Sequence, residues 1–183
     1  AFNVFGAETI EEVVVTGSYI KSSPTDGASP VDVVDRSYID EMAAVDISDI
    51  TRNLTVNSGS ENVPDSFTSG ATQGTSNVNL RGLGLGSTLV LVNGRRNTLA
   101  AATANDGSTF VDTSMIPVSA LQRVEVLKEG AASVYGSDAV AGVVNYITQK
   151  DFVGTEVGLH FQTTSSDSQD DKQITFLHGW END

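Results

Sequence analysis

The sequence predicts an α+β fold, in which short strands and short helices share one domain and a strand hairpin follows. Three apolar runs carry the β part of this prediction: Ser87–Val92, Leu121–Leu127 and Val140–Ile147. All are rich in β-branched residues, which suit a half-buried pleated surface. Two short helical patterns precede them in the chain. Two stretches that alternate apolar and polar residues follow them.

Glycine and asparagine mark the ends of the first run. Gly82, Gly84 and Gly86 stand just before it, where the backbone has to take unusual angles or pass close to another surface. We expect them to make a tight reversal between two strands of the sheet. Asn93-Gly94 follows the run and is a strong signal for a tight turn between strands.

A short strand and two helices are predicted ahead of these runs. Val31–Val34 is the strand candidate. Ser37 is the expected N-cap of a helix over Tyr38–Ala44, and Asp46 is the expected N-cap of a second helix over Ile47–Leu54.

The C-terminal stretch has the period of two expected of strands with one apolar and one polar face. Thr155–Gln162 and Gln173–Trp180 show it, and the polar residues 163–172 join them. Two such strands form a hairpin, which is marginally stable on its own in water.

Composition excludes several classes of protein. Ten Lys and Arg against 24 Asp and Glu give a formal net charge of −14, which argues against a nucleic-acid binder. Cysteine is absent, so we expect neither disulfides nor a thiolate metal site. No run approaches the roughly 20 apolar residues of a membrane helix, although membrane-spanning strands are nearly silent in hydropathy.

The Gly-rich stretch RGLGLG invites a nucleotide-binding interpretation, which would make the protein an enzyme. Such loops hold phosphates when they open a helix, but the residues after Gly86 predict a strand. His160 and His178 lack zinc-site spacing, and we find no nucleophile motif. The sequence therefore predicts no catalytic residues, no metal site and no cofactor.

Four motifs in a fixed order resemble the plug domain of the TonB-dependent outer-membrane receptors. They are Leu80-Arg81-Gly82, Val92–Arg96, the IP…RVEV segment Ile116–Val126, and the G…YG…GVVN…T segment Gly130–Thr148. None is specific alone, whereas the four in this order and spacing are.

The resemblance implies a plug with a small mixed β-sheet and short helices, followed by the start of an antiparallel transmembrane β-barrel. It divides the chain into a flexible N-terminus with a TonB box (1–17), the plug (18–152) and the first two barrel strands (153–183). Because such a barrel has about 22 strands, most of the receptor's own barrel would lie outside this chain.

The N-terminal segment is a short β-prone run next to acidic residues, which by itself favours an edge strand of the domain. Its position ahead of the plug makes it resemble the TonB box, and an extended segment can add as a strand to a partner's open sheet edge. The residues expected to bind this partner are Glu11, Glu12, Val13, Val14, Val15, Thr16 and Gly17.

Two long polar stretches, 55–79 and 97–110, have the composition of disordered loops. Loops this long inside a compact domain are often functional. The resemblance implies that both face outward and help to form the floor of a ligand pocket. The expected ligand contacts are Asn62, Asp65, Phe67, Gln73, Asn105 and Asp106.

Charged residues concentrate in and around the strand motifs. By themselves they favour a solvated sheet face, whereas the resemblance implies that some pair with the wall of the barrel lumen. The set is Arg81, Arg95, Arg96, Arg123, Glu125, Lys128 and Glu129.

The function implied is that of a gate without chemistry of its own. The plug would serve active uptake of a scarce nutrient (an iron-siderophore complex, cobalamin, haem or an oligosaccharide) through the outer membrane of a Gram-negative bacterium. Its N-terminus would lie in the periplasm, where the TonB energy-coupling protein binds. The alternatives are an extracellular carbohydrate-binding or adhesin β module and a nucleotide-dependent enzyme built on RGLGLG.

Overall fold

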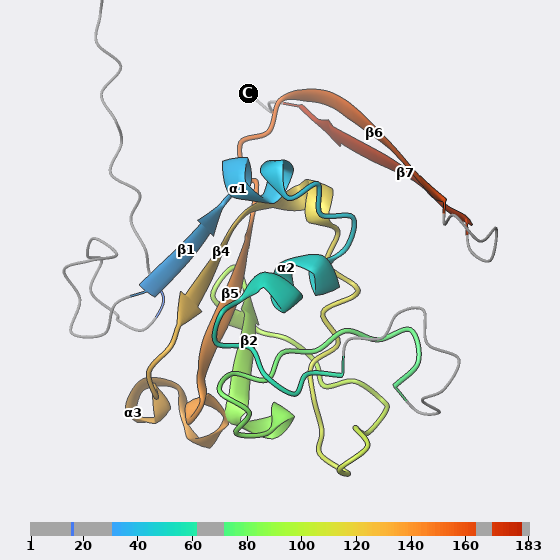
Figure 1. Ribbon diagram of the computed structural model, residues 1–183. Coiled ribbons are helices and arrows are strands. Elements are labelled where there is room, and N and C mark those ends of the chain that lie inside the picture. The colour runs from blue at the N-terminus through green and yellow to red at the C-terminus, as the bar shows by residue number, and fades with distance from the viewer. Residues whose placement is uncertain (1–15, 17–30, 62–71, 164–169, 181–183) are drawn as a thin grey trace, which may run out of the picture.

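The computed structural model describes residues 16, 31–61, 72–163 and 170–180. A five-stranded mixed sheet forms its centre, with the strand order β1-β4-β5-β2-β3 (Figure 1). The strands are β1 (Val31–Asp35), β2 (Thr88–Val92), β3 (Arg95–Arg96), β4 (Leu121–Leu127) and β5 (Gly142–Thr148). The three runs rich in β-branched residues thus form its inner strands, as predicted.

The sheet is mixed because β2 and β5 pair in parallel while its other pairs are antiparallel. A parallel pair requires a long crossover between its strands. Here the chain leaves β2 at Val92 and returns to β5 at Gly142, after forming β3 and β4 on the way. This arrangement confirms the predicted α+β class with a small mixed sheet.

Short helices accompany the sheet. They are α1 (Arg36–Glu41), α2 (Ile47–Asn53) and α3 (Ala132–Tyr135), with 3₁₀ turns η1 (Leu85–Ser87), η2 (Val118–Ala120) and η3 (Ser137–Ala139). Asp46 caps α2 as predicted, and Asp49 completes a capping box by accepting from the N-cap backbone.

The predicted start of the first helix was wrong. Asp35 is the N-cap, and its carboxylate accepts from the backbone N–H of Tyr38 at 2.9 Å. Ser37, the expected cap, instead donates its hydroxyl to Asp35 at 2.8 Å. An ionised carboxylate is a stronger acceptor at a helix N-terminus than a hydroxyl, so the earlier residue starts the helix.

Side chains alternate across the sheet and build a core on each face. On one face, α1 and α2 contribute Ile39, Ile47 and Ile50 against Val124 and Val144. On the other face lies a smaller cluster from β2, β4, β5 and the α3–η3 loop, made of Leu89, Leu91, Leu127, Ala131, Ala139 and Val143. Because successive side chains of a strand point to opposite faces, one sheet contributes to a core on each side.

Tyr146 is the largest side chain of the first core and is fully buried. Its burial raises the pKa of the phenol to about 12, so the ring stays neutral over the physiological range.

For the glycine-rich stretch, the predicted reversal between two strands of the sheet is wrong and the predicted strand after Gly86 is right. Leu80, just before it, makes only an isolated bridge to Asn57, so the glycines do not join two strands of the sheet. After Gly84, which has φ = 100°, the chain makes the 3₁₀ turn η1 and enters β2. The predicted strand after Gly86 is confirmed, and the helix required for a phosphate-binding loop is replaced by a single 3₁₀ turn.

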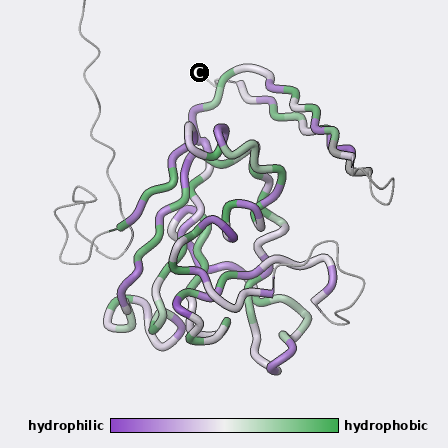
Figure 2. The backbone as a smooth tube through the Cα atoms, in the orientation of Figure 1, coloured by the Kyte–Doolittle hydropathy of each residue, from purple (hydrophilic) through white to green (hydrophobic). Residues whose placement is uncertain are grey.

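Strands β6 (Gly154–Thr163) and β7 (Asp170–Gly179) form a separate antiparallel two-stranded sheet beside α1 (Figure 1). Hydrophobic and hydrophilic residues alternate along it (Figure 2). Its apolar side chains are largely exposed; examples are Leu159 at 64% and Ile174 at 74%. Within the described ranges, no helix combines the length and apolar character needed to cross a membrane.

Candidate functional site

A polar cluster interrupts the second core, on the sheet face away from α1 and α2. Strands β4 and β5 place Glu125 and Asn145 directly opposite each other in the antiparallel register. Because neighbours along a strand point to opposite faces, Val124 and Val126 enter the first core while Glu125 points the other way. The pairing of the two strands therefore fixes the carboxylate and the amide side by side.

Thr16 closes this cluster from the N-terminal segment. Its hydroxyl donates to Oε2 of Glu125 and accepts from Nδ2 of Asn145 at 2.9 Å. Nε of Arg123 donates to Oε1 of Glu125 at 2.9 Å. We call Thr16, Arg123, Glu125 and Asn145 the Thr16 cluster.

Burial makes this cluster energetically significant. Glu125 is 0% exposed, Asn145 2%, Thr16 6% and Arg123 9%. A buried carboxylate is tolerated only when it is paired and hydrogen-bonded, as it is here. The hydrogen bonds of Thr16 to Glu125 and Asn145 hold this residue of the N-terminal segment against the sheet.

Asn145 also ties the cluster to the β2–β3 turn. Its Oδ1 accepts from the backbone N–H of Gly94 at 2.9 Å. The turn itself has φ of 51° at Asn93 and 75° at Gly94, as expected for the Asn-Gly pair that predicted it. One amide side chain thus contacts β4, the turn and the N-terminal segment.

The rest of the predicted TonB box (Glu11, Glu12, Val13, Val14, Val15 and Gly17) lies outside the described residues. Thr16 is the member that the structure describes. Its partner Glu125 belongs to the set predicted to contact a barrel wall, and that contact stays a prediction. Within this chain, Glu125 bonds to Thr16, Arg123 and Asn145.

The predicted ligand contacts divide between described and undescribed residues. Asn62, Asp65 and Phe67 lie outside the described residues. Gln73, Asn105 and Asp106 are exposed, in loops at the end of the domain remote from α1 and the β6–β7 hairpin (Figure 1).

Hydrogen bonds join these two loops. Both carboxylate oxygens of Glu61 accept from the backbone N–H of Asn105, at 3.0 and 3.3 Å. Nearby, the backbone N–H of Thr113 donates to the carbonyl of Ser76 at 2.8 Å. At the loop tip, the hydroxyl and the backbone N–H of Ser108 donate to the Asp106 carboxylate, at 2.6 and 2.8 Å, and these bonds lower its pKa. The loops therefore form one connected surface.

Two of the predicted barrel-contacting arginines bind the backbone of their own domain. The guanidinium of Arg81 donates to the carbonyls of Val140 and Ala141, with Nη2 3.0 Å from the latter oxygen. Arg96 donates to the carbonyl of Tyr135 and pairs with Asp138. The bond from Arg96 lowers the pKa of the Asp138 carboxyl. Both arginines hold the loop between β4 and β5 against the β2 side of the sheet.

The remaining charged residues of that set are spread over the domain. Lys128 pairs with Asp32 across β4 and β1, and Arg95 is exposed on β3. Glu129 follows β4 and is exposed.

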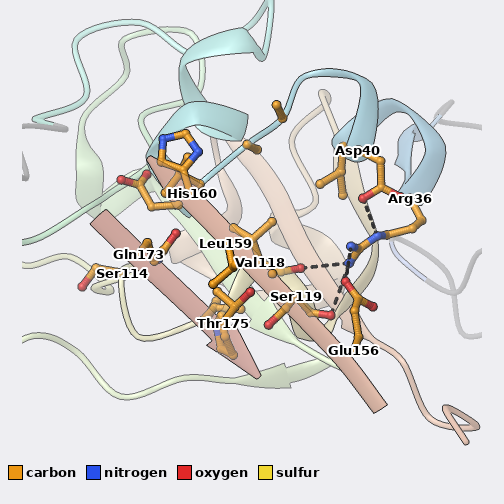
Figure 3. Close-up of a pocket in the computed structure, with 18 residues that line it drawn as sticks. Arg36, Asp40, Ser114, Val118, Ser119, Glu156, Leu159, His160, Gln173 and Thr175 are labelled. Atoms are coloured by element: carbon orange, nitrogen blue, oxygen red, sulfur yellow. Dashed lines mark hydrogen bonds and ion pairs between the residues drawn. The ribbon is translucent and has the colours of Figure 1, made fainter. Parts of the chain in front are cut away.

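A cavity of about 310 Å³ lies between α1, η2 and the hairpin (Figure 3). Arg36 lines one side of it: Nη1 donates to the carbonyls of Val118 and Ser119, each at 3.2 Å. Its Nε pairs with Asp40 at 2.9 Å and its Nη2 with Glu156 of β6 at 3.6 Å. Arg36 thus links the five-stranded sheet to the hairpin.

Sequence reasoning missed Arg36, Glu61 and Asn145 as connecting residues. Asn145 stood within the GVVN motif, where an asparagine inside a β-branched run was the available signal. Arg36 has one local partner, Asp40 at i+4, but its contacts with η2 and β6 are far away in sequence and carry no local signal. Glu61 carries none either, because its partner is the backbone N–H of Asn105. In the part of the chain that the structure describes, no three His, Asp or Glu side chains form a group able to hold a metal ion.

A family model described as the TonB-dependent receptor plug domain matches residues 23–143. Among solved structures, the siderophore receptor PirA from Acinetobacter baumannii is 26% identical with a TM-score of 0.57, covering 80% of this chain and 21% of that one. A variant of the ferric enterobactin receptor PfeA from Pseudomonas aeruginosa, in complex with enterobactin, is 25% identical with a TM-score of 0.55, covering 80% and 22%. The chain thus spans about a fifth of the length of these receptors.

Proposed function

Because the chain belongs to the family of TonB-dependent receptor plug domains, we propose that it is the gating plug of an outer-membrane receptor for active uptake of a small nutrient. The family match over residues 23–143, on a mixed sheet with short helices, is the observation that carries this proposal. The plug would fill the lumen of the receptor's own barrel and act without catalysis.

The domain boundaries follow from the same proposal. Residues 1–17 carry the TonB box, 18–152 the plug, and 153–183 the first two barrel strands. The exposed apolar side chains of β6 and β7 support the last assignment, since they alternate with polar ones as lipid-facing and lumen-facing residues do.

The N-terminal segment would bind the TonB energy-coupling protein from the periplasmic side. The contact of Thr16 with the sheet supports a segment that begins beside the plug. The connected loops that carry Gln73, Asn105 and Asp106 lie at the end of the domain remote from α1 and the β6–β7 hairpin, which supports a ligand-facing role.

Among the nutrient classes, the iron-siderophore class has the most support, because the two receptors described above bind siderophores by name. Its test is uptake of radiolabelled iron by cells that carry the complete receptor, with the ferric siderophore as donor. Uptake of labelled cobalamin, haem or oligosaccharide instead would assign the receptor to that class.

The coupling role is tested by capture of the periplasmic domain of TonB on the immobilised chain. Val14→Pro should abolish capture, because proline removes a backbone donor and blocks strand addition. The matched control is Ser22→Pro, which places the same residue outside the box and should capture like the native chain.

Equal capture by the native chain and by Val14→Pro would refute the coupling role. Specific sugar binding by the chain, combined with no capture of TonB, would favour the carbohydrate-binding module instead.

A further inference from the structure

A cavity of about 590 Å³ forms where the two stretches predicted to face a ligand, 55–79 and 97–110, meet. Thr75 lines it from the first stretch and residues 97–102 line it from the second. Asp112 and Met115, just after the second stretch, complete the lining. Small-molecule sites typically have volumes of about 300–1,000 Å³, so this cavity has the size of such a site.

Apolar side chains form part of this lining. Leu99 is 55% exposed and Met115 is 79% exposed, and the small side chains of residues 100–102 lie beside the same cavity. Apolar surface that is left uncovered around a cavity is typical of a binding site. It suits a ligand that presents C–H groups.

Asp112 is the only charged side chain among the described residues that line the cavity. Its Oδ1 accepts from the backbone N–H groups of Ser76, at 3.1 Å, and Ser114, at 3.0 Å. Within the described part of the chain both of its hydrogen bonds end on Oδ1, so Oδ2 is left to accept from a ligand. Asn97 and Thr98 add an amide and a hydroxyl to the lining.

The charge around the cavity disfavours an anionic ligand. The chain's ten Lys and Arg all lie outside residues 55–79 and 97–116. Arg95 and Arg96 immediately precede the second of these ranges, and neither lines the cavity. Carboxylates of one sign repel an anion over about 10 Å at 0.1 M salt. The acidic residues of the two ranges are Glu61, Asp65, Asp106 and Asp112.

An uncharged donor suits the cavity better than a cation does. A hydroxyl or an amide N–H forms a charge-assisted hydrogen bond with a carboxylate such as Asp112. A cation would lose its water against Leu99 and Met115, and that loss is costly when only one carboxylate compensates it.

We propose that this cavity binds an uncharged ligand with hydroxyl or amide donors and a C–H surface, and that Asp112 orients the ligand by accepting from one of these donors. That the ligand is the transported nutrient rests on the proposed function. An oligosaccharide and a neutral ferric hydroxamate share this chemistry, whereas an anionic ferric catecholate such as ferric enterobactin lacks it.

The test is a titration of the isotope-labelled 183-residue chain, followed by NMR of its backbone amides. The probes are maltotriose and the gallium(III) forms of ferrichrome and enterobactin, since gallium avoids the broadening caused by iron. We expect maltotriose or gallium ferrichrome to shift the amides of residues 97–102 and 112–115. Gallium enterobactin should bind at least about tenfold more weakly. The neutral probe that binds identifies the source of the donors.

Two variants place the ligand in the cavity. Asp112→Asn keeps an acceptor for Ser76 and Ser114 and replaces Oδ2 with an NH₂ group. It should weaken binding of the neutral probe about tenfold or more, as expected for loss of a hydrogen bond to a charged group. Ala101→Trp fills the cavity and should abolish binding. The matched control is Asp151→Asn, which removes the same charge from an exposed position between β5 and β6 and should bind like the native chain.

Gallium enterobactin that binds as tightly as the neutral probe would overturn the proposal. So would unshifted amides at 97–102 with both neutral probes, or native affinity in Ala101→Trp. If Asp112→Asn loses the dispersed spectrum of a folded chain, Ala101→Trp and the comparison of probes decide.

The readout needs no TonB, so it separates the two proposals. Binding of a neutral probe at 97–102, together with equal capture of TonB by the native chain and Val14→Pro, would leave the cavity proposal standing and remove the coupling role. Capture of TonB that Val14→Pro abolishes, with no shift by either neutral probe, would do the reverse.

Discussion

The five-stranded sheet and the β6–β7 hairpin are both built from alternating strands, yet they treat their apolar side chains in opposite ways. In the sheet, Val124, Val143 and Val144 are each 0% exposed, because helices cover one face and loop residues the other. In the hairpin, Phe161 and Phe176 are each 68% exposed. The same local pattern therefore yields a finished core in one region and an uncovered face in the other.

The sheet and the hairpin therefore differ in what stabilises them. Burial of apolar surface stabilises the sheet within the chain itself. The hairpin has a hydrogen-bonded ladder but little burial, so its apolar face needs cover from outside this chain. Under the proposed function, that cover would be the rest of a barrel and lipid.

A matched pair of side-chain truncations tests whether apolar burial stabilises the sheet more than the hairpin. Ile50→Ala removes a side chain that is 1% exposed in the first core and should lower the free energy of unfolding by about 2–5 kcal/mol. Ile174→Ala, on the hairpin, should change it by less than about 0.5 kcal/mol. Urea unfolding followed by circular dichroism measures both, and equal losses would contradict the comparison.

A second pair of variants, at two glycines, separates the effect of packing on stability from the effect of backbone strain. Gly142 and Gly154 have nearly the same φ, 138° and 136°. A Cβ at Gly142 would lie 2.4 Å from the carbonyl oxygen of Leu127, whereas one at Gly154 meets nothing within 4 Å.

Alanine should therefore be strained at both glycines, but should also clash at Gly142. We expect Gly142→Ala to be less stable than Gly154→Ala by about 1–3 kcal/mol in thermal or urea unfolding. Comparable stability of the two variants would show that the junction before β6 is as tightly packed as the sheet.

The smallest expected effect concerns the cap of α1. Hydrogen bonds from the backbone of Tyr38 and the hydroxyl of Ser37 lower the pKa of Asp35 below its usual 3.8. The ionised cap therefore stabilises the fold fully above pH 3.8, and this contribution is lost as the pH falls through the lowered value.

Asp35→Ala should cost about 0.5–1 kcal/mol at pH 7, because the cap is exposed, and progressively less below pH 3.8. Asp35→Asn, which keeps an acceptor at the cap, should lose less at pH 7. A cost for Asp35→Ala that stays constant from pH 7 to pH 2 would contradict this assignment of the cap.

The strands were predictable because each carries its own signal. Leu121–Leu127 was predicted with the bounds that β4 has, and the Asn93-Gly94 turn needed no long-range information. The start of α1 was predicted two residues late, because Ser37 is also a residue type that caps helices, and the structure shows that the Asp35 carboxylate is the acceptor for the N–H of Tyr38.

The sequence predicted which segment of the chain would form the candidate site, but not the contacts that its residues make. The motif order identified the plug, and the segment around Thr16 was expected to bind a partner. Its contact with Glu125 depends on how β4 meets β5, and nothing local to either residue encodes it. The same holds for Arg81, whose partners are backbone carbonyls about 60 residues away in sequence.

We propose that the coupling protein binds the N-terminal segment rather than an open edge of either sheet. Amide hydrogen exchange of the chain, with and without the periplasmic domain of TonB, tests it directly. We predict new protection confined to residues 11–17, while the amides of β1, β6 and β7 exchange as before. Protection gained along β1 or along the hairpin, with 11–17 unchanged, would contradict the account.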